Sequence, residues 1–371
     1  MTTNALYIGI MSGTSLDGID TVLVEIDNDR VRLLNSHDHP IPASLKQRIL
    51  NVSLGQPTSL PEIGELDHQL GKLYAQAVNA LLVKSGRKAS EITAIGNHGQ
   101  TVFHQPTGQI PFTIQLGDAN IIAALTQIDT VADFRRKDIA LGGQGAPLVP
   151  AFHQSIFQPQ HSSVVILNIG GIANLSVLRP NQAVVGYDTG PGNMLMDAWC
   201  NKHLGKAFDK GAKLALQGQV DQALLSELLK EPYLALTAPK STGRERFNLP
   251  WLEAIVSRFN AGVADVQRTL CEYTAQTIAN EVEPFQQGDR PELLVCGGGV
   301  HNPLLMKRLT ELLPQWCVMP TDEKGVDSDN MEAMAFAWLA YRRVHSLPSN
   351  LPEVTGAAKQ ASLGVMYFAD K

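Results

Sequence analysis

The stretch "YIGIMSGTSLDGIDTVLVEID", Tyr7–Asp27, places two apolar runs on either side of a turn filled with glycine, hydroxyl and carboxylate side chains. The runs Ala5–Met11 and Thr21–Ile26 are typical of buried strands. Most hairpins reverse within about two to five residues, whereas this turn, Ser12–Gly18, is longer. A turn of glycine, serine and threonine exposes N–H groups and hydroxyls that can converge on an anion, so it suits a phosphate. A plain hairpin with a solvated loop is the alternative.

Two further glycine turns bear on that choice. "NIGGIAN", Asn168–Asn174, repeats the arrangement of the opening stretch, and the cluster Gly297-Gly298-Gly299 stands between an apolar strand and a helix. In α/β folds nucleotides bind where strands end and helices begin. Three such turns, spread over both halves of the chain, favour a nucleotide site. The chain has no Gly-Lys-Ser/Thr P-loop and no G-x-G-x-x-G that opens a helix, which disfavours those two kinds of nucleotide site.

Composition narrows the class of protein. The 371 residues fit two ordinary domains or one large one, and 44% of them are apolar, enough for a substantial core. The formal net charge is −6 and no dense basic run occurs, which argues against nucleic acid as the main partner. The four cysteines form no C-x-x-C pair, so we expect free thiols in a reducing compartment.

Targeting signals are lacking in the amino-terminal residues "MTTNALYIG", which have no basic start and no apolar stretch of signal length. No apolar run reaches the roughly 18 residues that a membrane span needs. We therefore expect a cytoplasmic protein without a membrane partner.

Strand and helix patterns alternate along the whole chain, which predicts an α/β protein. The clearest helix pattern is Leu60–Ser85, with apolar residues every three or four positions. A glycine-rich connector, Leu141–Pro150, marks the expected boundary. We expect an amino-terminal lobe of residues 1–145 joined by 346–371, a second lobe of 146–345, and a ligand cleft between them. Further strands are predicted at Val31–His37, Ile92–Gly96, Thr130–Asp133, Ala183–Tyr187 and Leu293–Cys296, and helices at Ala43–Ser53, Ala119–Thr126, Val263–Phe285, Asn302–Leu312 and Asn330–Val344.

Six motifs together resemble one family. They are "GIMSGTSLDGID", "NHGQT", "DFRRKDIALGGQGAPLVP", "NIGGIAN", "DTGPGN" and "CGGGVHNP". Their order and spacing over nearly the whole chain are similar to the anhydro-N-acetylmuramic acid kinase family, within the actin/hexokinase/Hsp70 superfamily. The resemblance implies an actin-like ATPase fold of two ribonuclease H-like domains around a nucleotide. It also implies the reaction: with ATP and Mg²⁺, the sugar 1,6-anhydro-N-acetylmuramic acid is opened by water and phosphorylated on O6 during cell-wall recycling.

ATP contacts follow from the resemblance, in the three glycine turns. Many members of the superfamily carry an aspartate near magnesium at the position that Met11 occupies here. Asp17 or Asp20 could replace it; the choice stays open and no metal ligand is assigned. The implied ATP-binding residues are Gly13, Thr14, Ser15, Leu16, Asp17, Gly18, Ile19, Asp20, Gly170, Gly171, Asn174, Gly297, Gly298, Gly299 and Asn302, the last of which could instead cap a helix.

Asp188, in "GYDTGPGN", follows a predicted strand and precedes a predicted helix. A carboxylate at a strand end can move protons, although aspartate there also often caps a turn or helix. The resemblance favours catalysis, with Asp188 as the general base that deprotonates the attacking water. An inverting glycosidase needs a second carboxylic acid for its leaving oxygen. In the reaction that the resemblance implies, O6 leaves toward the γ-phosphorus of ATP instead, so we expect one catalytic carboxylate to suffice.

Five other residues are implied in sugar binding: Ser12, His98, Gln100, Arg135 and Glu332. Arg135 suits the lactyl carboxylate, because a guanidinium binds a carboxylate with two parallel hydrogen bonds. The alternatives are that Arg135 and Arg136 form a basic surface pair, that His98 is structural, and that Glu332 lies on a solvated helix face. An actin- or Hsp70-like ATP switch and a nucleotide-free hydrolase remain alternative functions. The family resemblance also suggests a homodimer.

Overall fold

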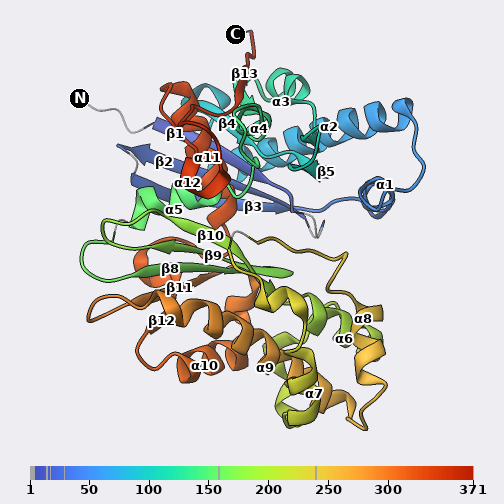
Figure 1. Ribbon diagram of the computed structural model, residues 1–371. Coiled ribbons are helices and arrows are strands. Elements are labelled where there is room, and N and C mark those ends of the chain that lie inside the picture. The colour runs from blue at the N-terminus through green and yellow to red at the C-terminus, as the bar shows by residue number, and fades with distance from the viewer. Residues whose placement is uncertain are drawn as a thin grey trace. The chain divides into compact units, whose positions relative to one another are not determined.

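The computed structural model describes residues 5–370 apart from 14, 15, 17, 29, 158 and 239. The chain forms two compact units: unit 1 is Met1–Ile156 with Asn330–Lys371, and unit 2 is Phe157–Asp329. Each unit is built around one mixed sheet with helices packed on it (Figure 1). The α/β class predicted from the sequence is therefore confirmed.

The main sheet of unit 1 has six strands in the order β13-β7-β4-β1-β2-β3. β1 pairs antiparallel with β2, which pairs antiparallel with β3, while β4 lies parallel to β1 and β7 parallel to β4. A separate hairpin is formed by β5 and β6. The strands are β1 (Ala5–Met11), β2 (Ile19–Asp27), β3 (Arg30–His39), β4 (Ile92–Asn97), β5 (Gln100–Gln105), β6 (Phe112–Leu116), β7 (Thr130–Ala132) and β13 (Val365–Tyr367). The helices are α1 (Ala43–Ser53), α2 (Leu60–Ser85), α3 (Ala119–Thr126), α4 (Arg136–Ala140), α5 (Val149–Phe157), α11 (Met331–Val344) and α12 (Pro352–Thr355).

Helix α2 begins and ends as its sequence indicates. The Ser59 hydroxyl accepts a hydrogen bond from the Glu62 N–H at its start, and Gly86 ends it in the left-handed conformation. Its stripe of leucines and alanines is buried against Ile8 and Ile10 of β1. Because side chains alternate along a strand, the residue between those two isoleucines, Gly9, faces the other side of the sheet.

Helix α11 covers that other side (Figure 1). Gly9 of β1 and Gly96 of β4 are paired neighbours in the sheet. A Cβ on Gly9 would overlap the carbonyl oxygen of Ala333, and one on Gly96 would overlap that of Phe336. The two glycines thus form a bare strip on which the helix backbone lies directly.

The sheet of unit 2 has five strands in the order β10-β9-β8-β11-β12. β8, β9 and β10 pair antiparallel in succession, whereas β11 lies parallel to β8 and β12 parallel to β11. Helices α9 and α10 pack on one face of this sheet. The strands are β8 (Val164–Ile169), β9 (Ile172–Leu178), β10 (Val185–Pro191), β11 (Glu292–Cys296) and β12 (Cys317–Pro320). The helices are α6 (Met194–Leu204), α7 (Gln222–Leu228), α8 (Leu249–Val256), α9 (Val263–Val282) and α10 (Pro303–Leu312).

The two sheets share one topology. In each, three consecutive antiparallel strands are followed by two strands parallel to the first, so β8-β9-β10-β11-β12 repeats β1-β2-β3-β4-β7. This is the duplication expected of two ribonuclease H-like domains. The echo between the opening stretch and "NIGGIAN" therefore reflects a repeated strand-turn-strand unit.

Among the differences from the sequence-based expectations, three bear on the lobe boundary and on Asp188. The helix at 330–344, assigned to residues 146–345, packs in unit 1 because the glycine strip of β1 and β4 receives it. The connector Leu141–Pro150 also lies within unit 1, where the Gln144 N–H donates to the Thr355 carbonyl. Asp188 was expected after its strand, but β10 continues to Pro191 because pairing with β9 resumes at Gly190 after an irregularity.

All four cysteines are free, and three of them are buried. No helix in the part of the chain that the structure describes is long and apolar enough to cross a membrane. Within the same residues, no group of three or more His, Cys, Asp or Glu side chains is arranged to hold a metal ion.

Candidate functional site

Four of the five residues expected to bind sugar form one hydrogen-bonded chain in unit 1. The Ser12 hydroxyl donates to Oε1 of Gln100 at 2.7 Å. Nδ1 of His98 lies 3.3 Å from the Ser12 carbonyl, and Nη2 of Arg135 lies 2.8 Å from Nε2 of His98. Ser12, His98 and Gln100 are all buried. The ends of β1 and β4 and the start of β5 bring these side chains together.

The proton on His98 can be placed from its neighbours. A guanidinium only donates, so Nε2 of His98 must accept from Arg135, and Nδ1 therefore carries the proton that is shared with the Ser12 carbonyl. Burial, reinforced by the charge of Arg135, lowers the pKa of His98 to about 3. His98 is thus a neutral imidazole at physiological pH, and its ring packs on Phe336 at 4.7 Å between centroids.

Arg135 is held from a second side by the glycine-rich connector. Its Nη1 donates to the Gly145 carbonyl at 2.7 Å, and the Gly145 N–H donates to Oδ2 of Asp138 at 2.8 Å. Nε of Arg135 is buried without a hydrogen-bond partner among the described residues. Burial lowers the pKa of Arg135 to about 10, which leaves it charged at neutral pH. Motif analysis singled out neither Gly145 nor Asp138, although both lie in the quoted "DFRRKDIALGGQGAPLVP".

Glu332, the fifth residue, is the second residue of α11 and is partly buried. Burial raises the pKa of Glu332, and the charge of Arg135 opposes that rise, so the two side chains interact electrostatically. Arg136, in contrast, is exposed and pairs with Asp133 at 2.8 Å. Of the two neighbouring arginines, only Arg135 joins the buried chain.

The opening turn is described in part, because Thr14, Ser15 and Asp17 lie outside the described residues. The Leu16 N–H donates to the Gly13 carbonyl at 3.2 Å. Leu16 and Ile19 point their side chains into the core of unit 1, so only their backbone could face a nucleotide. Gly18 is half-buried at the end of the turn.

The register of β1 and β2 places Asp20 directly opposite Met11. Met11 is buried and occupies the position where an aspartate was expected. Because paired residues on neighbouring strands project to the same face, the carboxylate of Asp20 lies beside that position. On its other side Asp20 faces Asp38 of β3.

The second glycine turn is a two-residue hairpin, Gly170-Gly171, between β8 and β9. The start of α6 packs against it. The Asn193 N–H donates to the Gly170 carbonyl at 2.8 Å. The Gly171 carbonyl accepts from the N–H groups of both Gly192 and Met194. Both carbonyls of this turn therefore already accept hydrogen bonds, so the groups that it can offer an anion are its backbone N–H donors.

The third glycine cluster is shaped by close packing. Gly297 has φ +77°, and a Cβ there would overlap Oδ1 of Asn168, while a Cβ on Gly299 would overlap the Ile169 side chain. Gly298 is exposed and has room for a side chain, since a Cβ there would lie 3.8 Å from the nearest atom, Nδ2 of Asn193. Asn302 accepts hydrogen bonds from two N–H groups in the first turn of α10, as a helix cap does.

Asp188 lies in the middle of β10 with one carboxylate oxygen occupied. Oδ2 accepts a hydrogen bond from the Ser241 hydroxyl at 2.7 Å and one from the Thr242 N–H at 3.0 Å. Burial raises the pKa of Asp188, and these two donors oppose the rise by stabilising the charged carboxylate. The raised pKa suits a group that must take up a proton.

A polar row crosses the sheet of unit 2 beside Asp188. Asn174 of β9 is paired with Asp188 of β10, and Asn168 of β8 is paired with Asn174. Paired side chains project to the same face, here the one opposite the core under α9 and α10. Asn168 was not among the sequence-derived site residues, although it opens the motif "NIGGIAN" that Asn174 closes.

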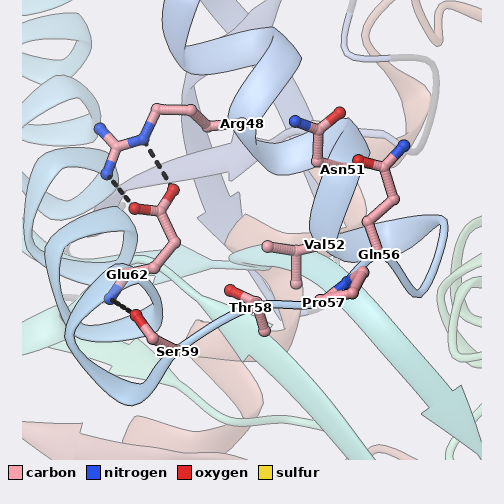
Figure 2. A pocket seen from close by; sticks show the side chains of 8 residues that line it. All are labelled: Arg48, Asn51, Val52, Gln56, Pro57, Thr58, Ser59 and Glu62. Atoms are coloured by element: carbon pink, nitrogen blue, oxygen red, sulfur yellow. Dashed lines mark hydrogen bonds and ion pairs between the residues drawn. The ribbon is translucent and has the colours of Figure 1, made fainter.

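A cavity of about 430 Å³ lies elsewhere in unit 1, at the connection between α1 and α2 (Figure 2). Its arginine, Arg48, is fully engaged: Nε and Nη2 donate to the Glu62 carboxylate at 2.8 and 2.9 Å (Figure 2), and Nη1 donates to Gln69. No sequence-derived site residue lines it. The lining residues are Arg48, Asn51, Val52, Gln56, Pro57, Thr58, Ser59 and Glu62.

Comparison with known sequences points to one family. A family model described as anhydro-N-acetylmuramic acid kinase matches residues 5–369. The chain is 68% identical to the anhydro-N-acetylmuramic acid kinase of Vibrio parahaemolyticus over 364 residues, which cover 98% of both chains. It is 66% identical to that of Vibrio cholerae over 370 residues, which cover 100% of both. Among solved structures, the activator of the 2-hydroxyisocaproyl-CoA dehydratase from Clostridium difficile has a TM-score of 0.46 and 10% identity, with 92% of this chain and 96% of that chain covered.

Proposed function

Since the chain belongs to the anhydro-N-acetylmuramic acid kinase family and is therefore a sugar kinase, we propose that Asp188 is its general base and that the buried chain around Arg135 binds its sugar. The family match over residues 5–369 carries the assignment of the reaction. The contacts of the described residues support the individual roles.

The reaction couples hydrolysis to phosphoryl transfer. A water oxygen attacks the anomeric carbon, the bond from that carbon to O6 breaks, and the proton released by water passes to Asp188. O6 bonds to the γ-phosphorus as the bond to the β,γ-bridging oxygen breaks, giving ADP and N-acetylmuramic acid 6-phosphate. Oδ2 of Asp188 already accepts two hydrogen bonds, so Oδ1 is the oxygen proposed to take the proton.

Sugar binding is assigned to unit 1. The Arg135 guanidinium is the cation proposed for the lactyl carboxylate, because its Nε is buried and without a partner in the described residues. His98, held neutral, fixes Arg135 without adding charge. Ser12, Gln100 and Glu332 supply the donors and acceptors proposed for the hydroxyl and N-acetyl groups.

ATP binding is assigned to the three glycine turns, with the residues that the motifs indicated. Mg²⁺ typically uses phosphate oxygens, waters and one or two carboxylates in such sites. Asp20 fits this role, because it stands beside Met11 at the end of β1; Asp17 lies outside the described residues. When bound, Mg²⁺ would neutralise charge on the phosphates. A cytoplasmic location and a homodimer are further proposals, the first supported by four free cysteines.

Product analysis in ¹⁸O-water tests the function. The expected product carries ¹⁸O at the anomeric hydroxyl and an unlabelled bridging O6 to phosphorus, with one ADP formed per sugar opened. Formation of ADP without the sugar would instead support an ATP switch, which the relatives' shared name does not favour. Ring opening without ATP would indicate a nucleotide-free hydrolase.

A further inference from the structure

Residues 240–242 wrap around Asp188 in a way that the reaction alone does not require. The Asp188 N–H donates to the Lys240 carbonyl at 3.2 Å. The Ser241 hydroxyl and the Thr242 N–H both donate to Oδ2, and neither is directed to Oδ1. From the other side, the Tyr233 hydroxyl donates to the Asp188 carbonyl at 2.7 Å. Backbone and side chain of Asp188 are thus held by one short segment and one tyrosine.

The segment is anchored by a buried ammonium. The Lys240 side chain is 2% exposed, and its Nζ lies 2.6 Å from Oε1 of Glu281. The ammonium also lies 5.1 Å from the ring centre of Tyr233 and 5.8 Å from that of Tyr187, whose hydroxyl donates to Glu281. A buried charge tolerates few geometries, because each loss of a partner is costly. The anchor therefore limits where the next two residues can lie.

We infer that Lys240–Thr242 form a carboxylate clamp, in which Ser241 is a positioning residue that turns Oδ1 of Asp188 toward the attacking water. The inference rests on the proposed role of Asp188 as base. Two donors on one oxygen prevent the carboxylate from rotating and leave the lone pairs of the other oxygen for the proton. Such orientation matters because a misplacement of about 1 Å can cost about 10²-fold in rate.

The clamp has a consequence for the acidic side of the pH profile. Asp188 must be ionised to act as base. The Ser241 hydroxyl stabilises the ionised form, whereas burial and the charge of Glu245 raise the pKa of Asp188. Of the other charged groups around Tyr233 and the segment, Lys240 is paired with Glu281 and Arg246 with Glu231. Removing the Ser241 hydroxyl should therefore raise the pKa of Asp188 and move the acidic limb of kcat to higher pH.

Ser241→Ala tests this directly, since Ser241 is exposed and its truncation spares the core. We expect kcat to fall about 10- to 100-fold, the acidic limb to move to higher pH, and the KM of both substrates to stay within about twofold of wild type. Ser241→Thr keeps the hydroxyl and should restore the wild-type limb. Ser226→Ala, an exposed serine of α7 in the same unit, is the matched control and should behave as wild type.

The outcomes separate the clamp from the base. An acidic limb that is unmoved in Ser241→Ala, or one that Ser241→Thr fails to restore, overturns the clamp. A change confined to the KM of the sugar also overturns it, because Ser241 would then be a sugar ligand. If Asp188→Asn is inactive while Ser241→Ala has a wild-type profile, the clamp alone fails. If Asp188→Asn keeps its turnover, the proposed base fails.

Discussion

Nη2 of Arg135 lies 2.8 Å from Nε2 of His98, so a half-buried guanidinium is held by a neutral imidazole instead of a carboxylate. A carboxylate partner would neutralise the arginine, whereas an imidazole fixes its direction and leaves its charge for a ligand. The other terminal nitrogen of Arg135, Nη1, donates to the Gly145 carbonyl, which is also uncharged. The carboxylates of Glu332 and Asp138 also act on this charge, and both oppose the lowering of the Arg135 pKa by burial.

Arg135→Lys is the substitution that separates charge from geometry. A lysine keeps the positive charge but cannot donate to Gly145 and His98 at once and still present two parallel donors. We expect the kcat/KM for the sugar to fall at least about 100-fold, while the KM for ATP changes little. Steady-state kinetics with each substrate varied checks this, and Arg136→Lys, at an exposed site, serves as control. An equal loss in the two arginine variants would contradict the assignment.

Asp188→Asn removes the proposed base and keeps the shape of the side chain. Because a general base contributes about 10²- to 10⁴-fold, kcat should fall by that factor. Binding of ATP and of sugar, measured by isothermal calorimetry, should remain close to that of the wild type. Near-normal turnover in this variant would exclude Asp188 as the base.

Gly9→Ala tests the packing that brings Glu332 to unit 1. A methyl group there would overlap the Ala333 carbonyl, next to Glu332 in α11. Overpacking of this kind costs about 1–3 kcal/mol, so we expect a clear loss of stability in urea unfolding together with a raised KM for the sugar. Gly64→Ala, at an exposed position of α2 with open space around it, is the matched control, because Gly64, like Gly9, has no positive φ. A Gly9→Ala protein as stable as wild type would show that the helix does not lie directly on the strand.

Acid should destabilise the protein through two buried histidines. Burial lowers the pKa of His98 and that of His153 to about 3, against about 6.5 in an unfolded chain. The unfolded state therefore binds protons that the native state lacks as the pH falls below about 6.5, and the stability present above that pH is lost progressively toward pH 3. Each histidine contributes a slope of up to about 1.4 kcal/mol per pH unit.

Urea unfolding at several pH values between about 7 and 5 measures this slope. His153→Gln, which cannot titrate, should make the slope shallower by about one proton, whatever it does to stability at neutral pH. An unchanged slope in that variant would mean that His153 is protonated in the native protein.

Local signals in the sequence were sufficient for most elements and for part of the site. The helices Ala43–Ser53, Leu60–Ser85 and Ala119–Thr126 were predicted with the bounds that the structure shows, because apolar spacing and capping residues act over one or two turns. The α/β class followed in the same way. The hairpin β5–β6 was not predicted, since its apolar residues Phe103, Phe112 and Ile114 are exposed and its pairing includes an irregularity.

The sequence by itself determined the class of fold, the repeated strand-turn-strand unit and the residue types of the site, because these depend on periodicity and motifs within short segments. Only the tertiary structure decided that α11 belongs to unit 1 and that Ser241 and Thr242 hold Asp188. Both outcomes depend on contacts between distant segments: two glycines that leave room for a helix backbone, and a buried lysine that anchors a loop. Steric fit and the pairing of a buried charge leave no periodic trace along a chain.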